Sequence, residues 1–555
     1  MQSRYAVHII IPAEWRWVIF AGSGLVLLAF LPFLWVALSS SAQSNWQFMG
    51  MIGVNYRDGA TYLAKMLQGV DGSWTVQFLH TPEAHDGFFL QALYLLLGHA
   101  ARLGGLPIVV MFHIARVGAA LFMYLAIYQL GATIWMRVRT RRIFFVIASV
   151  GAGFGWLFLL LVPNAADAAV PDISIPEAFP LFSTYVNVHF PLTIAFLSLL
   201  ASVFIVAFRP GMEELPGLSN GGVLVILLTL LLGLLYPQTL VPLGSALILL
   251  FIIRSLRQKR FDQHTFYWSL LLLLPAAPLF VYYKVITDTN PILAEWNRQN
   301  VTLAPNPLVL VIGLGLPLLL ALPAIYRALR RFEADGDQLM LAWLVAMLVA
   351  IYFPSDIQRR FAAGIMLVIA YFATRAVEDF WFNYIARRWR TRAFVLALPV
   401  MAFSQIFILI GPVLALLIGN PQAVAGMVLE RDYRAVFQWL RDNGEQGDII
   451  LASPNVSIWL PGWTGERVIY GHPFETMQAD QKRAAVVAWY TSSSAEECTA
   501  LLNGAYTLTT GYTVRYILVG PEERALGSDL TAVESQCLDS VQWVARIGEV
   551  DIYAP

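Results

Sequence analysis

The sequence predicts a polytopic α-helical membrane protein of about 11 transmembrane helices that carries a C-terminal extracytoplasmic α/β domain. Hydrophobic residues occupy 58% of the 555 positions and charged residues only 13%, a balance that one soluble core does not explain. Several apolar windows reach about 20 residues, the length needed to cross a bilayer. The formal net charge is zero and says little about partners, and no nucleic-acid partner is expected.

The first apolar run, Trp17–Leu38, is interpreted as a retained transmembrane helix. Arg4 and Arg16 precede it, and its end near Ala42 resembles a signal-peptidase site. A signal-peptide apolar region is roughly 7–15 residues long, whereas this run has 22. We therefore expect the helix to remain, with the N-terminus in the cytoplasm.

Basic clusters set the predicted orientation, because Lys and Arg gather on the cytoplasmic side of membrane proteins. There are four such clusters: Arg137–Arg142, Arg254–Arg260, Arg327–Arg331 and Arg387–Arg392. If all face the cytoplasm, an even number of crossings separates each from the next. Phe88–Leu103 must then be an interfacial or re-entrant helix on the outer surface. Gly221–Ile253 must be two short crossings hinged near Tyr236–Gln238, where Pro237 supplies the break.

The remaining apolar runs are each expected to cross once, namely Leu106–Trp135, Ile143–Val162, Phe190–Phe208, Phe266–Ile286, Leu308–Tyr326, Leu339–Phe353, Phe361–Val377 and Phe394–Ile418. The resulting odd total places everything after Gly419 outside. We therefore divide the chain into a transmembrane module, 1–419, whose first outer loop spans 39–105, and an extracytoplasmic α/β domain, 420–555.

The tail alternates helical and strand patterns. Helices are expected at Leu429–Asn443, Met477–Tyr490 and Ala495–Tyr506, and strands at Asp448–Leu451, Arg467–Tyr470, Arg515–Val519 and Val550–Tyr553. Both cysteines, Cys498 and Cys537, fall in this domain. They form either a disulfide, which an oxidising compartment favours, or two buried thiols.

The polar first loop, Gly53–Gln91, is the predicted catalytic segment. Asp58 in this loop is a candidate to deprotonate an acceptor or hold a divalent ion. The alternative is that it caps a helix over Gly59–Leu67. The cluster His80–Asp86 contains two imidazoles and two carboxylates that suit a metal or simply a solvated loop.

Three further sets of residues are candidates for binding. Glu177, Asn187 and His189 lie at the predicted mouth of a helix, where local hydrogen bonds are the alternative role for His189. Arg359 and Arg360 face outward at a predicted helix start and suit a phosphate or pyrophosphate, with lipid snorkelling as the alternative. In the tail, turn-rich segments carry Trp463, His472 and Glu475 and either help to seat an acceptor or form ordinary loops.

These features together resemble the GT-C superfamily of integral-membrane glycosyltransferases, which take a sugar from a polyprenyl-phosphate carrier and act on the outer face. The likeness rests on the first span, the acidic first outer loop, a following helix with Arg116 and the outer C-terminal domain. The spacing from Asp58 to Tyr62 is similar to the family's Asp-Glu-x-x-Tyr pattern. Gly59 replaces the Glu, and the family's Pro-Pro-Leu element is missing around Pro82.

The resemblance implies transfer of a sugar from a polyprenyl-phosphate donor to a lipid, glycan or protein acceptor at the cell membrane, among membrane lipids. Asp58 would be the general base or orient the acceptor. The donor phosphate is expected at Arg57, Arg359 and Arg360. The expected substrate-binding residues are Tyr62, His85, Asp86, Glu177, Asn187, His189 and His472. A divalent metal is the expected cofactor, with Asp58, His85, Asp86 and His189 as ligands.

A secondary transporter or flippase is the main alternative, because it also has many spans and polar residues within them. Transporters often show related halves and charged residues near the bilayer midplane, whereas here the reactive residues collect at outer loop ends. A non-catalytic membrane assembly factor is a third alternative.

Overall fold

The structure is a computed structural model, and it describes residues 9–40, 45–52, 55–162, 169–212, 214–218, 220–333, 336–418, 427–492, 494–508, 511–527 and 536–555. Four positions used above lie outside these ranges: Arg4, Ala42, Gly53 and the predicted domain boundary at 419/420.

The chain forms two compact units, and each contains segments far apart in the sequence. The first, called here the transmembrane unit, combines Met1–Phe30, Ala115–Tyr283 and Thr302–Ile410. The second, called here the loop-and-tail unit, combines Leu31–Ile114, Lys284–Val301 and Gly411–Pro555. The first outer loop and the C-terminal tail therefore belong to one body.

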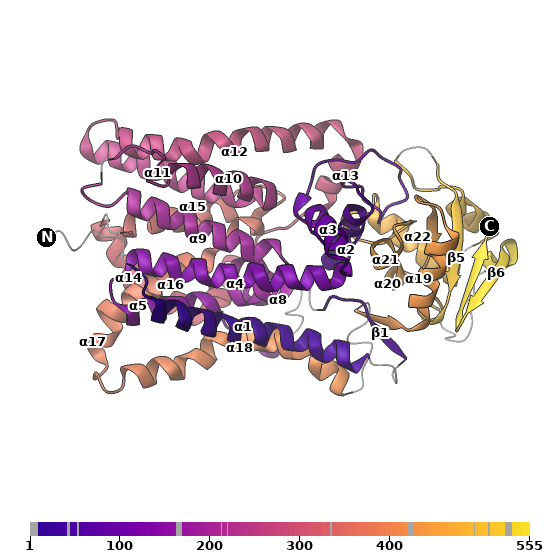
Figure 1. The fold of residues 1–555 in the computed structure, drawn as a ribbon, viewed down its shortest axis with the longest axis horizontal. Coiled ribbons are helices and arrows are strands. Elements are labelled where there is room, and N and C mark those ends of the chain that lie inside the picture. Colours follow the sequence, from indigo (N-terminus) through magenta and orange to yellow (C-terminus); the bar gives the residue numbers. More distant parts are fainter. Residues whose placement is uncertain are drawn as a thin grey trace. The chain divides into compact units, whose positions relative to one another are not determined.

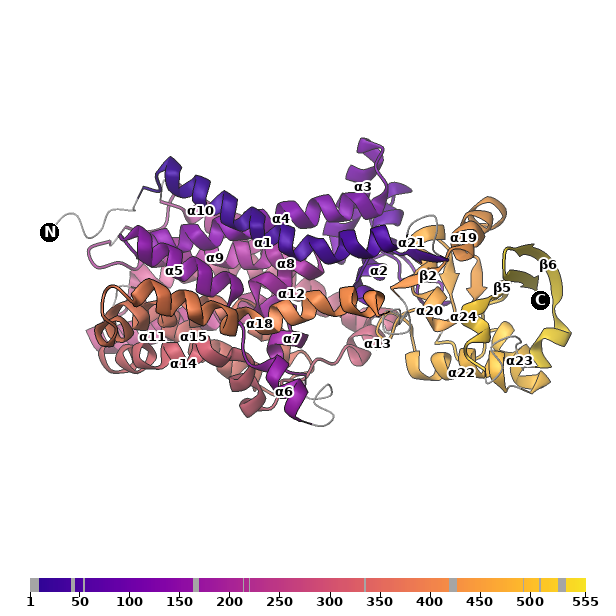
Figure 2. The same cartoon turned by 90° about the horizontal axis from the view of Figure 1, so that it is seen from below.

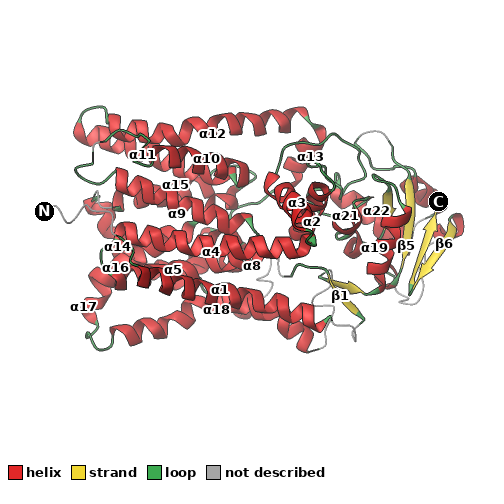
Figure 3. Ribbon diagram, in the orientation of Figure 1, coloured by secondary structure: helices red, strands yellow, loops and turns green. Residues whose placement is uncertain are grey.

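Nine helical segments in the described part of the chain are long and apolar enough to cross a membrane. They are α1 (Pro12–Ser39), α4 (Ile108–Ile134), α5–α6 (Val138–Leu161), α9 (His189–Ala207), η4–α11 (Pro237–Gln258), α12 (Gln263–Thr289), α14 (Pro307–Arg331), the segment Gln358–Tyr384, and α18 (Arg390–Leu417). Two shorter apolar helices are α10 (Gly222–Leu235) and α15 (Asp337–Ile351). The prediction of a polytopic helical membrane protein is confirmed (Figures 1 and 3).

The predicted hinge at Tyr236–Gln238 is present. Helix α10 ends at Leu235, a short 3-10 helix, η4, covers Pro237–Thr239, and α11 (Leu240–Gln258) follows. Pro237 interrupts the helical ladder because it has no backbone N–H to donate.

The predicted span Ile143–Val162 corresponds to the candidate span Val138–Leu161, which is made of two helices, α5 (Val138–Val150) and α6 (Gly155–Leu161). At the break, the Asp172 carboxylate accepts the backbone N–H groups of Gly153 (3.1 Å) and Gly155 (3.0 Å). In a continuous helix these two N–H groups would donate to backbone carbonyls, and here they donate to the Asp172 side chain instead. Short helices then lead to α9: α7 (Pro171–Ser174), η3 (Pro176–Ala178) and α8 (Pro180–Val186).

The predicted helix start at Phe361 is wrong. Helix α16 covers Ile365–Ala376, and Arg359 and Arg360 lie before it in a separate 3-10 helix, η5 (Gln358–Ala362). Gly364 has a φ of +75°, which separates the two elements. The backbone N–H groups of the long helix therefore start after the arginines. Helix α17 (Phe382–Tyr384) and the π-helix η6 (Val377–Trp381) follow α16.

In the loop-and-tail unit, helices α2 (Tyr56–Val70) and α3 (Ala92–Gly104) pack against each other, and α13 (Pro291–Gln299) belongs to the same unit. The backbones of α2 and α3 approach so closely that a Cβ on Gly98 would overlap the carbonyl oxygen of Met66. The rings of Tyr62 and Tyr94 stack between them, with centroids 4.1 Å apart. Tyr62 is thus part of the core here.

The tail folds as the predicted small α/β domain, around a five-stranded sheet of order β4-β3-β5-β7-β6. The strands are β3 (Ile449–Leu451), β4 (Arg467–Val468), β5 (Val514–Val519), β6 (Gln542–Ile547) and β7 (Val550–Ala554). β3 pairs in parallel with β4 and β5, and β7 pairs antiparallel with β5 and β6. Figure 2 shows α19 (Asp432–Asn443) on one side of the sheet and α22 (Ala479–Thr491) and α23 (Ala495–Leu502) on the other.

In the tail and the strand of the first loop that pairs with it, three strands and three short helices were not predicted. β1 (Trp46–Phe48) pairs antiparallel with β2 (Val428–Glu430) and joins the first loop to the tail. Such three-residue strands are too short to show alternation. The others are β6 and the helices α20 (Pro454–Ser457), α21 (Leu460–Thr464) and α24 (Pro521–Arg524).

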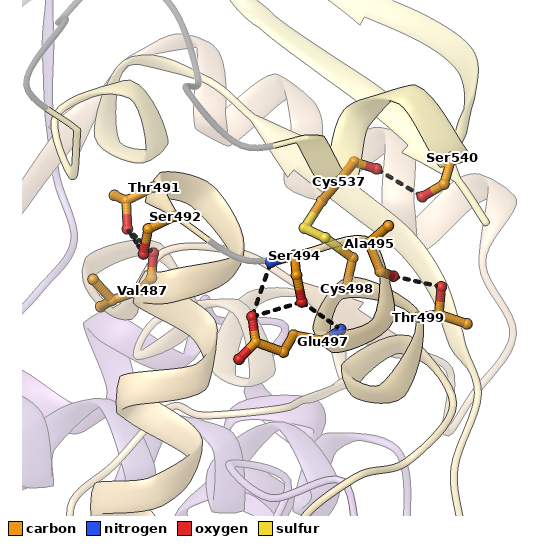
Figure 4. Close-up of a disulfide and its surroundings, with 10 residues drawn as sticks. All are labelled: Val487, Thr491, Ser492, Ser494, Ala495, Glu497, Cys498, Thr499, Cys537 and Ser540. Atoms are coloured by element: carbon orange, nitrogen blue, oxygen red, sulfur yellow. Dashed lines mark hydrogen bonds between the residues drawn. A yellow bond between two sulfur atoms is a disulfide. The ribbon is translucent and has the colours of Figure 1, made fainter.

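The two cysteines form a disulfide, which decides between the alternatives left open by the sequence. Cys498 in α23 bonds Cys537 in the 3-10 helix η8 (Gln536–Ser540), with a Cα separation of 5.3 Å (Figure 4). Both are fully buried. Ser494 and Glu497 form a capping box at the start of α23, which fixes this helix end beside the bridge.

We expect the double substitution Cys498→Ser/Cys537→Ser to lower the free energy of unfolding of the tail by about 2–4 kcal/mol, because the bridge closes a loop of moderate length. Urea unfolding of the full chain in detergent measures this. Dithiothreitol should destabilise the wild type and leave the variant unchanged. Equal sensitivity of both proteins to the reductant would contradict the bridge.

Candidate functional site

Asp58 lies in the first turn of α2 and contacts a residue of the tail. Its Oδ1 is 3.1 Å from Nε2 of His472, and both belong to the loop-and-tail unit. The Asp58 side chain is 38% exposed, whereas that of His472 is 3% exposed. The carboxylate is therefore held from the protein side and remains accessible to a substrate. The N-cap of α2 is Asn55, so the prediction that Asp58 caps this helix is wrong.

The hydrogen bonds of His472 define its tautomer. Its Nδ1 accepts the backbone N–H groups of Phe474 and Glu475, both at 3.2 Å. A nitrogen that accepts carries no proton in the neutral ring, so the proton is on Nε2 and is donated to Asp58. His472 thus orients the carboxylate as a neutral donor.

A buried ion pair, Lys65–Glu475, joins α2 to the same loop of the tail that carries His472. Lys65 Nζ, two turns after Asp58 on α2, lies 2.5 Å from Oε1 of Glu475, and both side chains are less than a tenth exposed. Burial alone would raise the pKa of Glu475, but the charge of Lys65 lowers it below its usual value. Separating the two side chains would leave each charge buried without a partner, which costs free energy. The ion pair therefore holds α2 against the tail.

His80 completes the cluster from the first loop. Its Nε2 is 2.9 Å from the Ile458 carbonyl and its Nδ1 is 3.8 Å from Oε2 of Glu475. Burial lowers the pKa of His80 to about 4. The ring is therefore neutral at physiological pH. Thr476 accepts the His472 backbone N–H and donates to the His80 carbonyl, which ties the loop to the tail.

Gly59 has a steric reason for being the residue after Asp58. A Cβ at this position would come within 2.7 Å of Cγ of Met51. A Glu at this position, as in the Asp-Glu-x-x-Tyr pattern, would require the Met51 side chain to move. With Gly59 here, Asp58 is the only acid of this pair of residues. Neighbouring Arg57 is exposed, and its Nε donates to the Tyr56 hydroxyl (3.2 Å).

The second polar cluster of the loop is largely structural in its contacts. His85 Nδ1 lies 2.9 Å from the Glu83 carbonyl, and its Nε2 accepts the Phe78 N–H at 3.0 Å. Burial lowers its pKa, which favours the neutral ring. The Glu83 carboxylate forms a buried ion pair with Lys482. Asp86 is exposed.

The predicted metal ligands Asp58, His85, Asp86 and His189 do not form a cluster. Within the described ranges, no group of three or more His, Cys, Asp or Glu side chains is placed to hold a metal. Both nitrogens of His85 are engaged with the backbone, so this ring does not fit an additional ligand role. The metal site stays a prediction, which the arrangement of His85 does not support.

The remaining candidates lie in the transmembrane unit around Glu177. The Tyr236 hydroxyl donates to Oε1 of Glu177 at 3.1 Å, and the ring of His189 lies 5.9 Å from that of Tyr236. Burial raises the pKa of Glu177, and the charges of Arg359 and Arg360 oppose this shift. Glu177 and the two arginines are therefore electrostatically coupled within one unit.

Asn187, Arg116 and Arg359 are held by the backbone of the same unit. Asn187 Oδ1 accepts the Phe190 N–H at 3.3 Å and so supports the start of α9. Buried Arg116 donates to the Tyr185 carbonyl. The Arg359 N–H donates to the Thr302 carbonyl at 3.0 Å, which positions η5. These bonds fix the backbone around the acidic and basic side chains.

Sequence reasoning missed Lys65 and Thr476. The signal for Lys65 was present, because Asp58, Tyr62 and Lys65 recur at helical spacing on one face of α2, where a lysine among apolar neighbours predicts a buried partner. Its partner Glu475 is 410 residues away, so no local pattern identifies it. Thr476 acts through its hydroxyl in a loop and has no motif.

No protein-family profile and no curated protein matches the sequence. Solved structures do match. An Archaeoglobus fulgidus oligosaccharyltransferase, tethered by a disulfide to an acceptor peptide containing the NVT sequon, aligns with a TM-score of 0.55 at 13% identity, over 91% of this chain and 70% of that chain. The same protein in complex with Zn and sulfate gives 0.54 at 12% identity, over 96% and 73%.

ArnT from Cupriavidus metallidurans bound to undecaprenyl phosphate aligns with a TM-score of 0.49 at 14% identity, over 96% of this chain and 98% of that chain. The likeness to the oligosaccharyltransferase covers most of the chain and shows that the two chains share a fold.

We expect the stability of the loop-and-tail unit to fall as the pH drops from about 6.5 to about 4. An unfolded chain protonates His80 near pH 6.5, whereas the folded protein does so only near pH 4. The unfolded state therefore binds more protons in this window. The free energy of unfolding should decrease by about 2 kcal/mol between pH 7 and 4.5, as measured by urea unfolding.

The control is His80→Gln, whose amide can still donate to the Ile458 carbonyl but does not titrate. Its unfolding free energy should vary less over the same window. A variant that keeps the full wild-type slope would exclude His80 as its source. The lowered pKa of Glu475 acts below this range, because its stabilising effect is lost only as the pH falls through the folded value.

Proposed function

We propose that the protein is a membrane glycosyltransferase that moves a sugar from a polyprenyl-phosphate carrier to a lipid, glycan or protein acceptor on the outer face of the cytoplasmic membrane. One observation carries the proposal. The fold is that of an oligosaccharyltransferase, and its first loop presents a partly exposed carboxylate, Asp58, that a neutral histidine orients.

The proposed reaction is a single displacement at the anomeric carbon of the sugar. The acceptor hydroxyl or amine forms the new bond to this carbon while the bond to the phosphate oxygen breaks. Asp58 accepts the proton that the acceptor loses, and the electron pair leaves with the polyprenyl phosphate. His472 touches neither reactant in this scheme and acts by holding Asp58, which makes it a positioning residue.

The leaving phosphate gains charge in the transition state, so the proposal needs cationic groups. We assign this role to Arg359 and Arg360, with Arg57 as a further phosphate contact. Support comes from the electrostatic coupling of both η5 arginines to Glu177. Tyr62, His85 and Asp86 on one unit, and Asn187 and His189 on the other, remain the predicted substrate contacts.

The proposed topology has eleven spans, with the N-terminus in the cytoplasm and the tail outside. The nine long and two short apolar helices of the described residues supply this number. The disulfide supports an outer location of the tail, because disulfides persist in oxidising compartments. The boundary between the membrane module and the outer domain is proposed at 419/420.

The Archaeoglobus fulgidus oligosaccharyltransferase has been crystallised with Zn and sulfate. In this chain the backbone contacts of His85 leave the predicted ligand set incomplete. The proposed step is therefore assigned to protein groups.

We expect Asp58→Asn to reduce sugar transfer at least about 100-fold, because the amide cannot accept the acceptor's proton. The assay incubates purified protein with radiolabelled polyprenyl-phosphate sugars and an extract of candidate acceptors. His472→Ala should also reduce the turnover number, and His472→Gln should retain more activity because its amide can still donate to Asp58.

The matched control is Asp480→Asn. Asp480 is an exposed aspartate in the first turn of α22, as Asp58 is in the first turn of α2. Transfer that survives Asp58→Asn at the wild-type rate would remove Asp58 from the reaction. Saturable solute uptake into vesicles without any transfer would instead support the transporter.

We expect Arg359→Gln/Arg360→Gln to lower the turnover number by about 10²–10³, since the interaction strengthens as the phosphate leaves. Arg387→Gln/Arg388→Gln removes two exposed arginines elsewhere in the chain and should leave transfer unchanged. Initial rates at several donor concentrations separate turnover from binding. If the η5 double variant changes neither the turnover number nor donor binding, Arg359 and Arg360 do not contact the phosphate.

A further inference from the structure

A second polar site lies at the ends of transmembrane helices and shares no residue with the candidates above. It is a cavity of about 700 Å³ between the turn after α9, the turn joining α11 to α12, and the start of α15. All of its lining residues belong to the transmembrane unit. The described lining includes four arginines, at positions 209, 254, 257 and 260, and one aspartate.

Three of these arginines, Arg254, Arg257 and Arg260, lie in or just after the last turns of α11. Arg254 is held rigidly, because it donates to Gln338 Oε1 (2.9 Å), Thr265 Oγ1 (3.2 Å) and the Phe208 carbonyl (3.0 Å). Arg257 is exposed and lies over the Phe332 ring, 4.5 Å from its centroid. Arg260 is exposed and bonds only a neutral amide, that of Gln258, among the contacts described.

The acidic residue of the lining, Asp262, attracts Arg254, and its oxygens are bonded within the start of α12. The Asp262 carboxylate accepts the Thr265 N–H (3.2 Å) and the Thr265 hydroxyl (2.7 Å), so it caps the start of α12. Within the described ranges, neither Arg257 nor Arg260 forms a salt bridge with a carboxylate. The cavity is therefore electropositive and suits an anion.

The surroundings of the cavity indicate where the anion comes from. Leu256 is 72% exposed and Phe261 56%, and each is the sequence neighbour of an exposed arginine, while Leu215 in the lining is 54% exposed. At the end of a membrane span, such side chains contact lipid, while the arginine heads reach the headgroup layer. A soluble anion would need no apolar rim. A phosphate attached to acyl chains matches both the arginines and the exposed apolar side chains.

We propose that this cavity binds the phosphate headgroup of an anionic membrane phospholipid. Arg257 and Arg260 bind the phosphate oxygens, and Arg254 fixes the cavity wall. The positive-inside trend places this end in the cytoplasmic leaflet, where basic pockets between helices are suited to such headgroups. The site is independent of the proposed sugar transfer.

Native mass spectrometry of the full-length protein tests this, after exchange into detergent with phosphatidylglycerol or with phosphatidylcholine. We expect the wild type to retain phosphatidylglycerol preferentially. Arg257→Gln/Arg260→Gln should weaken this retention about tenfold, because each lost cation removes part of the attraction. Arg257→Lys/Arg260→Lys keeps the charge and should retain most of the lipid.

The matched control is Arg330→Gln/Arg331→Gln, which removes two arginines at the end of α14 that do not line the cavity. Its retention should equal that of the wild type. Equal retention of the two lipids by the wild type, or equal loss in both glutamine variants, would overturn the proposal. Displacement of the lipid by millimolar inorganic phosphate would show a soluble anion site instead. A melting-temperature measurement confirms that each variant is folded.

Discussion

The buried ion pair between Lys65 and Glu475 is the interaction on which the geometry of the candidate site depends. Glu475 and His472 share one tight loop, so fixing Glu475 beside α2 also brings the His472 ring to Asp58. Two charges removed from water lose hydration, and only a close contact with further hydrogen bonds offsets that loss. Thr61 supplies such a bond, because its hydroxyl accepts from Lys65 Nζ.

Neutral histidines are a second consequence of this burial. His80 sits in the same cluster, where a positive ring would add to the charge of Lys65. Burial keeps it neutral, and the two N–H groups accepted by His472 Nδ1 fix which proton that ring donates. The carboxylate of Asp58 thus accepts a hydrogen bond from a neutral donor.

The transmembrane unit uses burial differently. Burial raises the pKa of Glu177, its carboxylate accepts a hydrogen bond from Tyr236, and the charges of Arg359 and Arg360 oppose the shift. The same unit holds the arginine-lined cavity at the end of α11, where the carboxylate of Asp262 caps α12.

The sequence by itself determined the apolar spans, the hinge at Pro237 and the α/β nature of the tail, because hydrophobic length, proline and strand alternation are local signals. It did not determine that α16 starts after Arg360, since the positive φ of Gly364 is a backbone choice. Only the tertiary structure joined Lys65 to Glu475, Asp58 to His472 and Cys498 to Cys537. Contacts between distant segments depend on how the chain packs, and no periodicity along the chain records them.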